Sequence, residues 1–512
     1  MVGNVYKNKF VPEAVALSYK GKKITYQELD VNVQKYATYF SNIGVKKGDK
    51  VLLSCLNSPE FIYSYLAVVR LGAIIVPVNL LLTFDEISYI IKNSDAKTMI
   101  FHPTVLSKIK GSKQFSKKAI ATLLGKKSVR AIVSALFGIN IIVLDDNFKK
   151  LISSIDDINF EEVDDQDLIS TFLYTSGTTG KPKAAMLTHK NLMSNTIQCT
   201  HVLEFFPEDN FICVLPMFHC FAFTTNVLLP LYNGASITIL ESFQPKELID
   251  TLIKEGVTIF CGVPSMFIVL LNAAKKEVAF PKLRLAVSGG ASIPAEVLKQ
   301  CKEKLNFPIL EGYGLSEASP VVSFNPYNGI QKESSVGLPL WDIKCKIVDE
   351  NEKELPQGEV GELIVKGNNV MIGYYKQEEQ TKETLKDGWL YTGDMAQIDE
   401  DGYIYIVDRK KDLVIVGGLN VYPREVEEVL YTHPKVKEAA VVGIVDNLRG
   451  EYVKTFIVLK DGEQCHSKEI LRFLKEHLAL YKIPREIEFI SELPKNATGK
   501  ILKKLLRTQP QK

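Results

Sequence analysis

Strand-like and helix-like segments alternate along the first hundred residues, and this alternation constrains the fold more than any other feature of the chain. Thr25 and Thr83 are each followed three positions later by a glutamate, Glu28 and Glu86, which is the capping box that opens a helix. The β-prone run 51–55 stands between the two predicted helices. Strands separated by helices pair in parallel within one sheet, so the alternation predicts an α/β fold of helix-flanked sheets.

The chain is long enough to need more than one hydrophobic core. Its 512 residues exceed the size at which a single core stops growing, so we expect two or more domains. From about residue 336 the pattern changes to short β-prone runs with turn dipeptides such as Asp387-Gly388, which indicates a mostly β subdomain. The charge run 408–412 lies between apolar segments and is a predicted boundary or hinge.

The composition is typical of a globular enzyme, with 46% hydrophobic and 24% charged residues. A net charge of +2 gives no reason to expect a nucleic-acid partner. The eight cysteines form no CxxC pair, which favours reduced thiols in the cytoplasm and no zinc site. The first ten residues contain no apolar core of a secretory signal, and no feature specifies an oligomeric state.

Two stretches bear on membranes and pockets. The run 211–240 contains no charged residue, but Pro216, His219 and Pro230 interrupt it, so a buried segment lining a pocket fits better than a spanning helix. The segment 108–130 is basic and interleaved with apolar residues. It fits peripheral contact with an anionic membrane, at the inner face for a cytoplasmic protein, and equally a helix with a solvated basic face.

A loop of small, hydroxylic and basic residues follows the buried run 169–174. Two glycines free the backbone to curl around an anion, and hydroxyls and lysines add donors and charge, which predicts a polyphosphate cradle rather than a flexible surface turn. The residues concerned are Thr175, Ser176, Gly177, Thr178, Thr179, Gly180, Lys181 and Lys183. The loop is not a Walker A motif, because Thr175 replaces its first glycine and Pro182 follows Lys181.

Two further glycine-rich loops follow predicted strands, at 288–291 and 312–317. Open α/β sheets bind ligands at such strand ends. The Gly-Tyr-Gly of the second loop is a weak signal by itself, and it does not fit GxGxxG because Glu317 occupies the third glycine position.

Taken in order, these motifs resemble the AMP-forming acyl-CoA synthetases of the adenylate-forming superfamily, closest to bacterial-type medium- and long-chain fatty acid–CoA ligases. The motifs that carry the resemblance are Tyr174–Ala184, Gly312–Glu317, Tyr391–Asp394, Asp408–Lys411 and Pro494–Lys500. The resemblance implies a large domain at 1–408, made of helix-flanked sheets and a β subdomain, and a small mobile α+β domain at 409–512. It also implies that ATP activates a fatty acid as acyl-AMP, and that CoA then accepts the acyl group while AMP and pyrophosphate are released.

The resemblance also implies a role for each motif residue. Lys500 would be the catalytic lysine of adenylation, Thr175 and Glu317 would act beside it, and Glu317 would bind Mg²⁺. ATP would be held by Thr175 through Gly180, Lys183, Gly290, Ala291, Glu311, Gly312, Tyr313, Gly314, Ser316, Asp394, Arg409 and Lys500. Within that set, Lys183 meets the terminal phosphates, Ser316 the α-phosphate, Tyr313 the adenine, and Asp394 with Arg409 the ribose.

The remaining implied roles concern the second half-reaction and the acid. Lys411 matches the hinge, Gly417 and Gly418 the CoA channel, and His219, Phe223 and Gly289 the acyl pocket. The uncharged run 211–240 favours an apolar acid. The alternatives are an aryl acid–CoA ligase, a fatty acyl-AMP ligase that loads a carrier protein, and a non-catalytic scaffold with the same fold.

Overall fold

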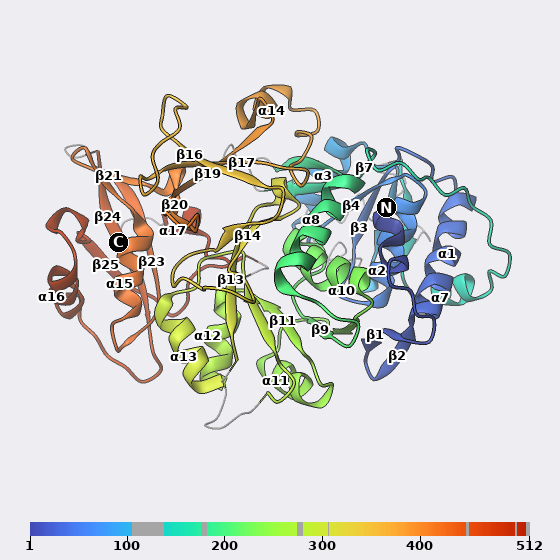
Figure 1. Cartoon of the computed structure of the whole chain (residues 1–512), viewed down its shortest axis with the longest axis horizontal. Coiled ribbons are helices and arrows are strands. Elements are labelled where there is room, and N and C mark those ends of the chain that lie inside the picture. Colours follow the sequence, from blue (N-terminus) through green and yellow to red (C-terminus); the bar gives the residue numbers. More distant parts are fainter. Residues whose placement is uncertain are drawn as a thin grey trace, which may run out of the picture.

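The structure of the protein is a computed structural model, and it describes residues 1–104, 138–175, 182–273, 280–305, 307–446, 450–496 and 499–507. Figure 1 shows the elements in space, with α1 (Tyr26–Asn42) and α7 (Asp146–Ser153) at one end of the long axis and the C-terminal sheet at the other. The predicted basic segment 108–130 lies outside the described residues.

One sheet contains the strands predicted near the N-terminus, and its described part has six strands. In spatial order these are β6 (Asn140–Val143), β5 (Thr98–Phe101), β3 (Lys50–Ser54), β4 (Ile74–Pro77), β7 (Ile169–Thr175) and β8 (Lys183–Thr188). All neighbours pair in parallel except β7 and β8, which are antiparallel. The capping boxes of Thr25 and Thr83 both form, at the starts of α1 and α3 (Phe84–Ser94). The predicted helix-flanked α/β fold is confirmed.

A second sheet has nine strands among the described residues. Their order is β15 (Leu338–Pro339), β14 (Val321–Phe324), β13 (Ile309–Gly314), β12 (Leu285–Ser288), β11 (Ile259–Gly262), β9 (Asn210–Cys213), β10 (Ser236–Ile239), β1 (Val15–Tyr19) and β2 (Lys22–Thr25). From β13 to β1 every neighbouring pair is parallel. Parallel strands place their carboxyl ends at one edge, where this fold class binds ligands.

Helices cover and connect these two sheets. They include α2 (Pro59–Arg70), α8 (His189–Leu203), α11 (Pro245–Lys254), α12 (Pro264–Ala273) and α13 (Ala295–Leu305). The side chain of Asn57, just before α2, joins the sheets: its Nδ2 donates to the carbonyls of Leu215 at 2.9 Å and Leu240 at 3.1 Å. The N–H of Met217 donates to Asn57 Oδ1 at 2.8 Å. Asn57 thus holds the carboxyl ends of β3, β9 and β10 together.

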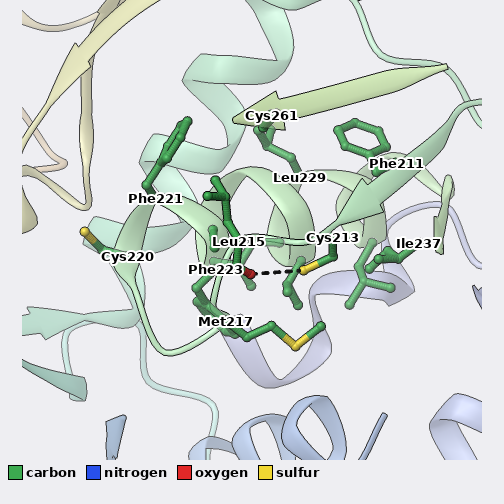
Figure 2. Close-up of a cluster of buried hydrophobic side chains, with 14 of the residues drawn as sticks. Phe211, Cys213, Leu215, Met217, Cys220, Phe221, Phe223, Leu229, Ile237 and Cys261 are labelled. Atoms are coloured by element: carbon green, nitrogen blue, oxygen red, sulfur yellow. Dashed lines mark hydrogen bonds between the residues drawn. The ribbon is translucent and has the colours of Figure 1, made fainter. Parts of the chain in front are cut away.

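Most of the uncharged run 211–240 is buried, and Figure 2 shows its side chains packed in a hydrophobic cluster. It forms β9, α9 (Cys220–Phe223), a π-helical turn η2 (Thr224–Leu228), α10 (Leu229–Asn233) and β10. Within the part of the chain that the structure describes, no helix combines the length and the apolar character needed to cross a membrane.

The predicted β subdomain is an antiparallel sheet whose described strands number five. These are β16 (Lys344–Val348), β17 (Gly361–Lys366), β19 (Trp389–Ile398), β18 (Leu385–Lys386) and β20 (Ile404–Arg409). Asp387 and Gly388 both have positive φ, at 51° and 78°, and make the predicted tight turn between β18 and β19. The helix α14 (Glu378–Thr384) precedes this turn.

The C-terminal part folds around its own sheet and helices. Its described strands are β22 (Leu419–Val421), β21 (Val414–Val416), β24 (Gly450–Leu459), β23 (Val436–Asp446) and β25 (Glu486–Phe489). Its helices are α15 (Pro423–Tyr431), α16 (Ser467–His477) and α17 (Lys503–Arg507). The two hydrophobic clusters of this part consist of residues from 414 onward, separate from the clusters of the larger sheets.

Candidate active site

The strand that precedes the predicted phosphate loop extends one residue beyond the predicted run 169–174. β7 ends at Thr175, and Thr175 pairs across the antiparallel ladder with Lys183, the first residue of β8. The two residues that flank the loop therefore lie side by side. Ser176, Gly177, Thr178, Thr179, Gly180 and Lys181 lie outside the described residues.

Glu317 is the centre of a polar cluster beside Thr175. Its Oε1 accepts a hydrogen bond from the hydroxyl of Tyr374 at 2.8 Å and a longer one from Thr175 Oγ1 at 3.5 Å. Lys183 Nζ lies 5.3 Å from the centroid of the Tyr374 ring. Tyr374 was not predicted, since it belongs to none of the motifs. Its role arises because the segment around it pairs with β8 through the bridge from Tyr374 to Ala185.

Asp394, Arg409 and Tyr313 form a second cluster. Asp394 is 2% exposed and lies opposite Arg409 in the β19–β20 ladder. Its Oδ1 is 2.8 Å from Arg409 Nε, and its Oδ2 accepts a hydrogen bond from the Tyr313 hydroxyl at 2.5 Å. Burial, with the Asp394 charge adding to it, raises the pKa of Tyr313 well above its usual value, so the phenol keeps its proton. The structure thus brings three predicted nucleotide-binding residues together.

Gly312–Gly314, predicted as the start of a loop, are the last residues of β13 and pair with β14, and they lie beside the glycine-rich loop that follows β12. Ser288, the last residue of β12, pairs with Glu311 of β13, so Gly289–Ala291 and Gly312–Gly314 are neighbours. Gly290 has φ of +80°, a conformation that favours glycine. Glu311 is 3% exposed, its Oε1 accepts the Ile293 N–H at 3.3 Å, and burial raises its pKa to about 7. Below about pH 7 the carboxyl group of Glu311 is therefore largely protonated and uncharged.

The predicted acyl-pocket residues occupy different surroundings. His219 caps α9 by accepting the Phe221 N–H on Nδ1 at 3.3 Å. Burial first, and then the nearby positive charge of Lys500, lower the pKa of His219 to about 4, so the ring is neutral. Phe223 stacks on Tyr65, with centroids 3.9 Å apart, and the atoms nearest to a Cβ added at Gly289 all belong to Phe221.

Phe221 is the aromatic residue that lies against Gly289. A Cβ added to Gly289 would be 2.9 Å from the ring of Phe221. The alternation of aromatic residues at 221 and 223 gives no means of telling which ring faces the site, because α9 is a single turn whose orientation depends on its neighbours.

Lys500 reaches this site from the C-terminal part of the chain. Gly499 beside it has φ of +81°, and an added Cβ would be 2.5 Å from Ser265 Oγ at the start of α12. Lys500 is an exposed residue, yet the surrounding protein partly desolvates its amine. This desolvation, followed by the charge of Arg409, lowers the pKa of Lys500 to about 8.

The residues predicted for the CoA channel lie in a separate turn, whereas the predicted hinge residue is near the cluster, because its charge acts on the pKa of Lys500. Lys411 is in the 3₁₀ turn η4 (Lys410–Asp412), which directly follows β20. Gly417 and Gly418 have φ of +59° and +84° in the turn between β21 and β22. A Cβ added to either glycine meets no described atom within 4 Å, so this turn stands clear of the site in this arrangement.

One further cluster in the described part of the chain could hold a metal ion. Ligand atoms of His433, Cys465 and Glu469 lie within 4.8 Å of one another. Lys435 contacts two members of this cluster. Its Nζ is 2.9 Å from Glu469, and its backbone N–H donates to His433 Nδ1 at 3.3 Å. These contacts explain the cluster as a buried imidazole beside a surface ion pair.

The chain matches two family profiles. Residues 7–375 match the AMP-binding enzyme family, and residues 425–500 match the AMP-binding enzyme C-terminal domain.

The chain belongs to the AMP-binding enzyme family.

Curated relatives of this AMP-binding enzyme cover nearly its whole length. The long-chain-fatty-acid–CoA ligase of Bacillus subtilis is 34% identical, over 97% of this chain and 91% of the relative. The feruloyl-CoA synthase of an Amycolatopsis species is 32% identical, over 98% of this chain and 96% of the relative.

Solved structures show the same fold. ATP-bound MatB from Rhodopseudomonas palustris superimposes with a TM-score of 0.89 at 32% identity, covering 99% of this chain and 98% of that one. The apo form of the same MatB gives 0.78 with the same coverage. This AMP-binding enzyme is therefore more similar to the ATP-bound than to the apo arrangement of MatB.

Proposed function

We propose that this AMP-binding enzyme activates a medium- to long-chain fatty acid with ATP and transfers the acyl group to CoA. The observation that carries the proposal is that Lys500 lies near enough to the Asp394–Arg409 ion pair for both charges to act on its pKa, in a chain 34% identical to a long-chain-fatty-acid–CoA ligase. The products are acyl-CoA, AMP and pyrophosphate.

Adenylation joins two groups that repel each other. A carboxylate oxygen attacks the α-phosphorus of ATP, and the bond from that phosphorus to the pyrophosphate oxygen breaks. Positive charge must gather where negative charge builds up. Lys500, whose pKa of about 8 keeps it mostly protonated at pH 7, would bridge the carboxylate and the α-phosphate. Lys183 and the loop from Thr175 to Gly180 would hold the departing pyrophosphate.

The cluster around Asp394 and the adjacent glycine-rich segments would bind the nucleotide. Asp394, held by Arg409 and Tyr313, would accept hydrogen bonds from the ribose hydroxyls. The Tyr313 ring would stack on adenine, with Gly289–Ala291 on its other side and Glu311–Gly314 along the edge. Ser316 would donate to the α-phosphate.

Glu317 fits a Mg²⁺ site of the kind that serves nucleotide phosphates. Such sites use one or two carboxylates together with the phosphates themselves. Glu317 is fixed by Tyr374 beside Thr175, and both described hydrogen bonds to its carboxylate end on Oε1. Bound there, Mg²⁺ would neutralise phosphate charge.

We further propose that 1–408 and 409–512 act as two domains. The separate hydrophobic clusters from residue 414 onward support this division, and the greater similarity to ATP-bound MatB supports an adenylation arrangement. Rotation about Lys411 would withdraw Lys500 and bring Gly417 and Gly418 to the CoA channel. The CoA sulfur would then attack the acyl carbonyl carbon, and AMP would leave.

The acid would lie in the apolar region formed by the run 211–240. Neutral His219 and the ring of Phe221 against Gly289 offer it an uncharged surface. Phe223, which stacks on Tyr65, would support this surface without contacting the acid.

The segment 108–130 would add peripheral contact with an anionic membrane that supplies the fatty acid. Sedimentation with vesicles containing an anionic lipid, compared with neutral vesicles, tests this contact. Equal sedimentation with both would contradict it.

ATP–pyrophosphate exchange across acids of increasing chain length, together with aryl acids, tests the proposed activity. We expect the fastest exchange with medium- or long-chain fatty acids, and acyl-CoA formation when CoA is added. A preference for aryl acids would place the chain with the feruloyl-CoA synthases. Accumulation of acyl-AMP despite CoA would favour a carrier loader, and no exchange with any acid would refute the proposal.

A further inference from the structure

The thiol of Cys220 lies against the hydroxyl of Ser316. Cys220 is the first residue of α9 and is 6% exposed, and its Sγ is 3.3 Å from Ser316 Oγ at the start of η3 (Ser316–Ala318). Figure 2 shows this thiol pointing away from the buried cluster, whereas the thiol of Cys213 points to the carbonyl of Leu215. None of the roles proposed above uses the Cys220 thiol.

A second buried contact fixes the distance between these two segments. One helical turn after Cys220, the hydroxyl of Thr224 donates to the carbonyl of Ser319 at 3.0 Å, and both residues are 0% exposed. Two contacts one turn apart hold α9 and η3 in register. The proximity of Sγ and Oγ is therefore set by the buried structure and not by the rotamer of one side chain.

The protonated thiol can donate a hydrogen bond to Ser316. Burial raises the pKa of Cys220 to about 11, so the sulfur keeps its proton at neutral pH. Two acceptors face it, Ser316 Oγ at 3.3 Å and His219 Nδ1 at 4.0 Å, and Nδ1 already accepts the Phe221 N–H. Either atom can donate in the Cys220–Ser316 contact, but once the Ser316 O–H donates to a phosphate, its Oγ is left as the acceptor and the protonated thiol as the donor.

We propose that Cys220 is a positioning residue for adenylation, because its S–H turns the Ser316 O–H toward the α-phosphate of ATP. This role rests on the proposed function, in which Ser316 contacts that phosphate. Lys500 lies close enough to His219 to affect its titration, which places the same corner of the site beside the catalytic lysine. A donor oriented before the reaction stabilises the developing charge without reorganisation.

ATP–pyrophosphate exchange in a double-mutant cycle tests this role. Cys220→Ala should lower the kcat of exchange about fivefold, the typical effect of one net hydrogen bond, and should change the KM for ATP much less. Cys220→Ser, which keeps a donor, should recover most of the rate. In a Ser316→Ala background, Cys220→Ala should cause no further loss, because its effect passes through Ser316.

Cys213→Ala is the matched control. Cys213 is also buried and lies in the same run, but its thiol faces the carbonyl of Leu215. This variant should keep the kcat of exchange, and thermal melting should show similar stability losses for both alanine variants.

Three results would overturn the role of Cys220: an unchanged kcat in Cys220→Ala, the same fold-loss in both backgrounds, or a serine variant as slow as the alanine variant. A wild-type protein without exchange would instead refute the proposed function and this role with it.

Discussion

Lys500 illustrates how a residue acquires its chemistry from its surroundings. A lysine near the end of a chain is ordinarily solvated and fully protonated, but here desolvation by the surrounding protein, followed by the charge of Arg409, lowers its pKa to about 8. Because Lys500 lies 91 positions after Arg409 in the chain, only the fold brings the two cations together. The amine is held close to the charge it would neutralise.

Lys500→Ala should abolish most adenylation while sparing the second half-reaction. Removal of one preorganised donor typically lowers the rate by about 10²–10³. ATP–pyrophosphate exchange should fall by that factor, while conversion of supplied acyl-AMP to acyl-CoA should continue. Equal loss of both activities would contradict a role confined to adenylation.

The pKa of Lys500 predicts the high-pH limb of adenylation. The protonated amine would be the active form, so kcat/KM for ATP, which reports the free enzyme, should be constant up to about pH 7, fall to half near pH 8 and decrease further above it. Bound ATP adds negative charge and raises the pKa of Lys500, so kcat, which reports the enzyme–substrate complex, should begin to fall at a higher pH than kcat/KM. The guanidinium of Lys500→Arg does not titrate in this range, so any residual activity of this variant should not fall near pH 8. If that fall persisted in this variant, another group would be responsible.

At the scale of elements, the loop that carries Lys500 depends on one close approach. Gly499 has φ of +81° and its Cα faces Ser265 of α12, so an added methyl group would push the loop away. Gly499→Ala should therefore slow adenylation by about tenfold, the effect of about 1.4 kcal/mol, with less effect on thioester formation.

Gly462→Ala controls for backbone strain in this experiment. Gly462 has almost the same φ of +83°, but an added Cβ meets no described atom within 4 Å. We expect this control to keep adenylation. If both variants lost it equally, the contact with Ser265 would not be the cause.

The short turn at Lys411 is the element about which rotation is proposed. Lys411→Pro fixes φ and should preserve pyrophosphate exchange while blocking transfer of the acyl group from acyl-AMP to CoA. Lys411→Ala, which removes the side chain without fixing φ, should keep both half-reactions. Parallel loss of both in the proline variant would contradict the hinge.

At the scale of the whole molecule, a buried arginine ties the N-terminus to the larger sheets. Arg70 is 1% exposed; its Nε donates to the carbonyl of Gly3 at 3.0 Å, and its Nη2 is 3.0 Å from Asp30 Oδ1. Arg70→Ala should destabilise the protein by about 3 kcal/mol, toward the low end for a broken buried pair because Asp30 keeps some exposure. Lys20→Ala, which breaks an exposed pair with Glu241, should change stability by less than about 1 kcal/mol. Urea denaturation of both variants checks the difference.

Local signals account for the parts of the fold that could be predicted. The capping boxes at Thr25 and Thr83 and the turn at Asp387-Gly388 formed as expected, because each depends on atoms a few residues apart. The order of strands could not be predicted, because it depends on which apolar faces pack together. Tyr374 was missed for this reason: its contact with Glu317 spans 57 positions.

The sequence by itself determined the helix-flanked α/β framework and the identity of the motif residues, because caps, turns and strand-end loops are encoded locally. Only the tertiary structure decided that Phe221 and not Phe223 faces Gly289, and that Cys220 touches Ser316 across 96 positions. Such contacts depend on the burial of whole elements against one another, which no short stretch of sequence contains.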